Sequence, residues 1–169
     1  SAGTGTVTYN GIASQNVAAV TYNNLAINKT TGIAVANAAL TANGNLSITA
    51  GELDLNANAT IIGNITVSSG AILYGDGITI NAGGNWSNSG TFNAGTGTVV
   101  LNGTGAQSIS ATTFNNLSIN KSTGTANLIG NLAINSDLWV QSGTFDLATY
   151  TSDRSAAGGQ LNISDGATL

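Results

Sequence analysis

The side chains in this chain that could carry acid–base chemistry are its seven carboxylates, because it has no histidine and no cysteine. A glycosidase needs two carboxyl groups facing each other across a sugar, about 5–9.5 Å apart. Glu52 and Asp54 stand two residues apart, which places both on one face of a strand. A later, similar segment has Thr144 in place of Glu52 and keeps only Asp146. We therefore expect Asp54 and Asp146 to occupy an outer ladder or corner position, with no catalytic residues and no enzyme.

Metal and phosphate sites are equally poorly supported. A calcium site needs about six to eight oxygen ligands, typically from several carboxylates, and the turn at 74–77 offers only Asp76. The glycine-rich segments 3–5 and 95–97 precede strand-like sequence, so no helix N-terminus is available to hold an anion. The sequence therefore predicts no metal and no cofactor.

The cations are too few to make a basic surface. Lys29, Lys121 and Arg154 are the only three, and the net charge is −4. A nucleic-acid binder neutralises phosphates with a basic stripe, so we expect no nucleic-acid partner. No apolar run approaches the roughly 18–20 residues that span a bilayer, so we expect no membrane insertion. Lys29 and Lys121 recur in an NK(T/S)TG segment, which predicts a solvated turn.

A long internal repeat organises the chain. Residues 3–55 align without a gap to residues 95–147, with about 25 of the 53 positions identical. Residues 64–73 then align with 160–169, four residues out of the earlier register, so extra residues fall around 150–157. We predict one domain over residues 1–169, made of two long repeats at about 3–92 and 95–169, the second incomplete.

Within each repeat, apolar residues alternate with polar ones over short stretches that end at Gly, Asn or Ser. This spacing is typical of strands with one buried face, whereas no helical stripe is present. The residues expected to point into one core are Leu25, Ile27, Leu46, Ile48, Leu117, Ile119, Leu138 and Val140.

Equivalent strands recur about every 17–23 residues, so four or five coils would make the 92-residue unit. Such recurrence favours a parallel β-solenoid, in which each coil stacks on the previous one, over the alternative, a β-sandwich. Gly-Asn pairs precede several strands, and an Asn amide at a corner can hydrogen-bond to the next coil. The absence of proline also fits strands whose N–H groups all lie in ladders. The predicted fold class is all-β, a parallel β-solenoid.

The combination of NNL-x-INK, a glycine-rich turn and a strand of the type L-x-I-x-SGTFDL resembles repeat segments of large secreted bacterial surface proteins. These are adhesins and passengers of the autotransporter and filamentous-haemagglutinin types. The resemblance implies a right-handed parallel β-helix, export to the cell surface, and a structural or adhesive role. It transfers no catalytic residue to this chain.

The two tryptophans differ in expected position. Trp86 follows Gly-Asn as Leu46 does, which predicts a core side chain. Trp139 lies between the inward Leu138 and Val140 and should point outward, where it could contact a sugar or a subunit.

Together these patterns predict a non-enzymatic extracellular structural protein, a building block of a cell-surface fibre or filament that assembles end to end. Its expected partners are identical subunits head to tail or the continuation of a longer polypeptide. Val7 and Ile163 are the residues expected at that contact. A glycan- or surface-binding adhesin module is the main alternative. Thr-x-Thr pairs such as Thr4/Thr6 and Thr96/Thr98 leave an ice-binding solenoid as a third.

Overall fold

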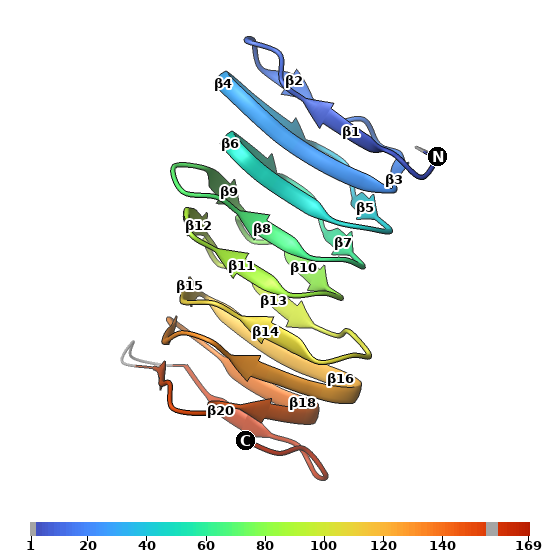
Figure 1. Cartoon of the computed structure of the whole chain (residues 1–169). Coiled ribbons are helices and arrows are strands. Elements are labelled where there is room, and N and C mark those ends of the chain that lie inside the picture. Colours follow the sequence, from blue (N-terminus) through green and yellow to red (C-terminus); the bar gives the residue numbers. More distant parts are fainter. Residues whose placement is uncertain (1–2, 155–158) are drawn as a thin grey trace.

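The chain winds into a parallel β-solenoid of about 8 turns, as a computed structural model that describes residues 3–154 and 159–169 shows (Figure 1). All strand pairs are parallel, and the coils stack from the N-terminal end to the C-terminal end. Successive ladder partners lie 18 to 24 residues apart, from Val7–Leu25 to Thr144–Thr168. The predicted all-β parallel solenoid is confirmed.

Each coil has three faces, which the chain visits in a fixed order. The first face is formed by β1 (Thr6–Tyr9), β4 (Asn24–Ala36), β6 (Leu46–Leu55), β8 (Ile65–Val67), β11 (Trp86–Asn88), β14 (Gln107–Ile109), β16 (Asn116–Leu128) and β18 (Leu138–Asp146). The second face is formed by β2 (Gln15–Asn16), the ends of β4 and β6, β9 (Ile72–Tyr74), β12 (Thr91–Asn93), β15 (Thr112–Phe114), β17 (Leu132–Ile134) and β19 (Ser152–Asp153). The third face is formed by β3 (Thr21–Tyr22), β5 (Leu40–Ala42), β7 (Ala59–Ile61), β10 (Thr79–Ala82), β13 (Thr98–Leu101), the starts of β16 and β18, and β20 (Leu161–Ile163).

The 92-residue sequence repeat is not a whole number of coils. Leu25, in β4, belongs to the first face, whereas the equivalent Leu117, in β16, belongs to the third. From Leu25 to Leu117, the 92-residue repeat covers four complete coils and two of the three faces of the next coil. Its length thus lies between the four and the five coils expected. The local neighbours are nevertheless kept, since Leu25 pairs with Leu46 and Leu117 with the equivalent Leu138. One sequence can occupy either face because both present the same parallel ladder to the same kind of core.

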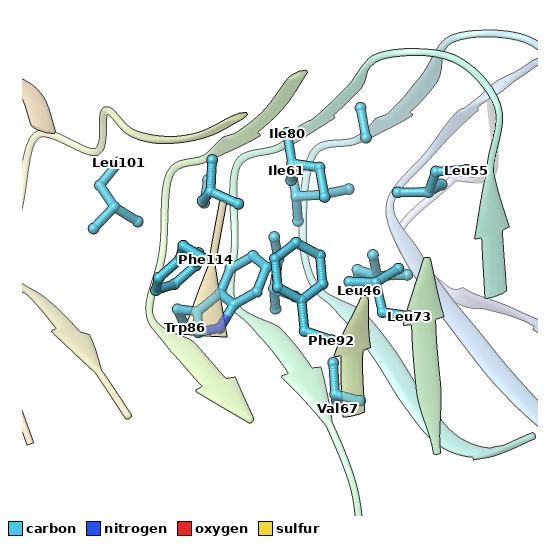
Figure 2. Close-up of a cluster of buried hydrophobic side chains, with 14 of the residues drawn as sticks. Leu46, Leu55, Ile61, Val67, Leu73, Ile80, Trp86, Phe92, Leu101 and Phe114 are labelled. Carbon is cyan, nitrogen blue, oxygen red and sulfur yellow. The ribbon is translucent and has the colours of Figure 1, made fainter. Parts of the chain in front are cut away.

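The core is a continuous column of aliphatic side chains from successive coils. All eight residues predicted to point inward are at most 1% exposed, which confirms the alternation argument. Trp86, Phe92 and Phe114 form an aromatic group in the middle of this column (Figure 2). Trp86 is 1% exposed, as its Gly-Asn context predicted.

Asparagine side chains tie one corner of the solenoid together. The backbone N–H of Asn45 donates to Oδ1 of Asn24, one coil earlier, at 2.8 Å. Asn64 and Asn85 continue the series, each with a 2.8 Å bond to the preceding Asn. The expected hydrogen bonding of corner amides to the neighbouring coil is confirmed.

Among the described residues, no helix is long and apolar enough to cross a bilayer.

Candidate functional site

The ladder of the second face is interrupted between β12 and β15. β12 pairs with β9, and β15 pairs with β17, but no ladder pairing joins β12 to β15 within the described residues. The strands β15, β17 and β19 consequently form a separate sheet of three strands. We call this break, between residues 91–93 and 112–114, the β12/β15 cleft.

The aromatic group lies behind the cleft, at the break in the ladder. The ring centroids of Phe92 and Phe114, inward residues of the two unpaired strands, lie 5.9 Å apart in an edge contact. Trp86 lies against both, at 4.9 Å from Phe92 and 5.3 Å from Phe114. Parallel strands pair at about 4.8 Å, and the break in the ladder coincides with the wider spacing of these two rings, whose edge contact needs more room. The coil at this break is also long, because Trp86 pairs with Ile109, which is 23 residues later in the chain.

Two adjacent hollows open along the cleft. One, of about 600 Å³, is lined by polar side chains including Asn88, Thr91, Asn131 and Asp153. The other, of about 550 Å³, is lined by residues that include Tyr74, Asp76, Asn93 and Asn135. Phe92 and Thr113 line both hollows, so the two adjoin at these side chains.

The charge around the cleft is acidic. Asp76 lies at one hollow and Asp153 at the other, and no lysine or arginine is among the lining residues. Both lysines are buried elsewhere at 1% exposure, and Nη2 of Arg154 donates to the Ser136 carbonyl at 3.0 Å. The site therefore offers hydroxyl, amide and carboxylate groups but no cation to pair with an anionic ligand.

The two lysines correct the sequence prediction of solvated turns. Lys29 is 1% exposed, and its Nζ donates to the carbonyl oxygens of Gly11 and Ala13 at 2.5 and 2.8 Å. A third bond, of 3.0 Å, goes to Oε1 of Gln15. The ammonium group lies at a corner of the preceding coil, where it donates hydrogen bonds to carbonyl groups that the turn leaves unpaired.

An equivalent set of contacts around a buried lysine, which we call a lysine cage, recurs one repeat later at a different corner of the coil. Nζ of Lys121 donates to the Gly103 carbonyl and to Oε1 of Gln107, both at 2.6 Å. Burial lowers the pKa of Lys121 from its ordinary 10.5, because removal from water penalises the ammonium form. Gly143 packs on this lysine with a φ of 80°, and a Cβ there would lie 2.9 Å from Cβ of Lys121.

A sequence signal for the cages was present. Gly11, Gln15 and Lys29 recur at the 92-residue offset as Gly103, Gln107 and Lys121, although the residues between them change from IAS to TGA. The repeat keeps Gly, Gln and Lys while the three residues between the Gly and the Gln change, and this is the sequence signal for the cages. Because fully buried lysine is rare, the motif alone favours a solvated turn.

The structure places the carboxylates on more than one face of the solenoid. Glu52 and Asp54 lie on the outer side of β6 on the second face, both half-buried. Asp146 ends β18 on the first face, where its Oδ1 accepts the N–H of Ala148 at 2.8 Å. Asp54 and Asp146 are thus both outer residues, as predicted, but on different ladders. No group of three potential metal ligands occurs in the described part of the chain.

The predicted contact residues lie at the surface to different degrees. Trp139 points outward at 46% exposure, and its Nε1 donates to Oγ of Ser164 at 3.2 Å. Ile163 is 47% exposed in β20, whereas Val7 in β1 is half-buried and packs against the core. Part of the insertion predicted around 150–157 lies outside the described residues.

A regular threonine array is not found on the outer side of the first face. Its central column runs Thr8, Ala26, Ser47, Thr66 and Ser87 from coil to coil. Ice binding by a solenoid would require threonine pairs at matching positions in successive coils. On the third face Thr21, Thr41 and Thr60 do stack in three successive coils, but Asn81 and Val100 follow them. None of the three threonines has a second threonine two residues on, so the ice-binding alternative gains no paired array.

Fold and surface together define a β-solenoid repeat protein that is rich in asparagine and threonine and poor in charged residues. No protein family, no curated protein and no solved structure matches this chain.

Proposed function

We infer that this chain is a non-enzymatic structural protein, a β-solenoid building block of an extracellular or cell-surface fibre. Its building blocks would assemble end to end, through identical subunits stacked head to tail or through further coils of a longer polypeptide. A solenoid suits this role because each coil contacts only its neighbours, so length can be added without a new fold.

The observation that carries the proposal is the two-sided parallel pairing of the internal coils. For example, β6 pairs with β4 on one edge and with β8 on the other, so a coil of this type accepts a neighbour on each side. The inward-type side chains of β20, Leu161 and Ile163, remain 45% and 47% exposed. An edge with free N–H and C=O groups and exposed apolar side chains is a template for another parallel strand.

The 92-residue repeat indicates that a strand of the β1 type can pair on both of its edges. β1 is equivalent in sequence to β13, and β13 pairs with a strand on both of its sides, β10 and β16. A strand of the β1 type therefore accepts parallel partners on both edges within this protein. The same chemistry would operate between two copies.

The location is proposed from composition. Charged residues make up 6% of the chain and cysteine is absent, so the surface relies on neutral Asn, Thr, Ser and Gly. This composition, with the resemblance to surface-protein repeats, supports an extracellular setting.

The test is sedimentation velocity of the whole chain over a range of concentrations, with single charges placed on the two edges. Ile163→Asp and Val7→Asp should each weaken assembly, because an unpaired charge buried in a new contact is costly. Asn162→Asp and Thr8→Asp are the matched controls, since they add the same charge to the outer side of the same strands. A chain that stays monomeric at the highest concentration, or controls that weaken assembly equally, would contradict assembly through identical subunits.

A further inference from the structure

The β12/β15 cleft has unused hydrogen-bonding capacity in its walls. β12 and β15 each use one edge for ladder pairing, with β9 and β17 respectively. The main-chain N–H and C=O groups on their facing edges make no ladder bonds to each other. Backbone polar groups are almost always paired with protein, water or ligand, so these edges are donors and acceptors available to a bound molecule.

The lining combines those groups with an apolar floor. Phe92 retains 9% exposure, whereas its ring partners Trp86 and Phe114 are at most 1% exposed. Thr91 and Thr113 are exposed on the outer sides of the two strands, and Asn131 is exposed at the rim. A partly exposed aromatic ring surrounded by hydroxyl and amide groups suits a ligand that has apolar C–H surfaces and many hydroxyls.

Size and charge narrow the class of ligand. Hollows of about 600 and 550 Å³ lie within the range of about 300–1,000 Å³ that is usual for small-molecule sites. The two carboxylates, Asp76 and Asp153, with no cation lining either hollow, disfavour anionic ligands. Because the hollows adjoin at Phe92 and Thr113, a ligand of more than one linked ring is favoured over a single ring.

An inserted peptide strand does not fit. A strand between β12 and β15 needs two ladder spacings, about 9.6 Å. Some Cα atoms of β12 and β15 still lie within 8 Å of each other. The cleft is thus too wide for a ladder and too narrow for an added strand.

We propose that the β12/β15 cleft binds a neutral oligosaccharide, with a sugar ring against the exposed part of the Phe92 ring. Hydroxyls of the sugar bond to the open strand edges, to Thr91 and Thr113, and to the carboxylate of Asp153. The site lies on the side of the solenoid and extends from β12, in the middle of its length, to β19, the last described strand of the second face.

The test is isothermal titration of the whole chain with neutral tetrasaccharides of glucose, mannose and N-acetylglucosamine. Tetragalacturonate and spermidine serve as the anionic and cationic controls. At least one neutral tetrasaccharide should bind, and tetragalacturonate should not. Thr113→Phe, which adds a ring where the two hollows adjoin, should weaken binding by about tenfold or more.

The matched control is Thr66→Phe, which adds the same ring to an outer position where the ladder is closed on both sides. Its binding should stay within about twofold of the parent, and both variants should keep the parent's circular dichroism. Location has a separate readout, since Trp139→Phe leaves Trp86 as the sole tryptophan. Nε1 of Trp86 donates to Thr112 in the cleft wall at 3.1 Å, so saccharide binding should change Trp86 fluorescence.

The proposal is overturned if none of the neutral tetrasaccharides binds, if only a charged probe binds, or if Thr66→Phe weakens binding as much as Thr113→Phe. A chain that stays monomeric yet binds the saccharide would contradict assembly through identical subunits and leave this proposal standing.

Discussion

Replacing Lys121 by methionine tests the lysine cage most sharply. Methionine fills most of the volume of the side chain, so the main loss is of the ammonium donor. Oε1 of Gln107 keeps a second donor, the N–H of Gly103 at 3.0 Å, and is not left unpaired. The Gly103 carbonyl loses the lysine bond in a buried position. A buried acceptor left unpaired costs about 1–3 kcal/mol.

The removal of a buried charge offsets part of this cost, because the ammonium was taken out of water on folding. We therefore expect Lys121→Met to lower the free energy of unfolding by about 1–2 kcal/mol. Lys29→Met is the internal control, since Gly11 is half-buried and Ala13 is exposed, so water can replace the lost bonds. Its cost should be below about 1 kcal/mol.

Urea unfolding followed by circular dichroism measures both variants, and hydrogen exchange at the Gly103 amide gives a local readout. The reasoning is refuted if Lys121→Met is as stable as the parent, or if Lys29→Met is the more destabilised of the two.

Four further outcomes follow from the same structure. Burial lowers the pKa of Lys121, so between that lowered pKa and 10.5 the folded state binds fewer protons than the unfolded state. The free energy of unfolding of the parent, relative to Lys121→Met, should therefore rise with pH across this window and level off above it. Urea titrations at several pH values measure this dependence. Ile119→Asp should cost several kcal/mol and lower the melting temperature sharply, since Ile119 is 0% exposed; melting like the parent would show that the inward assignment is wrong. Gly51→Ala should cost about 1–3 kcal/mol in urea unfolding, because Gly51 has a φ of 77° and a Cβ would lie 2.6 Å from the Lys29 carbonyl oxygen; an unchanged midpoint would contradict this. Ser118→Ala should be neutral or stabilising by up to about 1 kcal/mol, because the Ser118 hydroxyl is buried without a hydrogen-bond partner; a clear loss of stability would reveal a bond to that hydroxyl.

The solenoid could be predicted because its information is local and repeated. Leu46 and Ile48 show the two-residue alternation of a strand, and the same pair recurs one coil later as Ile65 and Val67. Stacking then follows from the repeat, since equivalent residues in successive coils must meet. The change of face between repeats was not predictable in this way, because the path depends on summed lengths of coils that vary from 18 to 24 residues.

The lysine cages and the cleft depend on contacts between coils that no single segment encodes. The cage of Lys121 draws its acceptors from Gly103 and Gln107, which are 18 and 14 residues earlier. The cleft coincides with a contact between Phe92 and Phe114, which lie in different coils. Single-segment reasoning treats a lysine as a surface charge and a phenylalanine as ordinary core, so neither site was anticipated.

The central claim is that coils of this type form a continuous extracellular fibre, and electron microscopy of the native material tests it most directly. The account predicts filaments one solenoid wide, with an axial repeat near 4.8 Å, the spacing of stacked parallel strands. Separate monomers, or globular assemblies without that repeat along their axis, would contradict it.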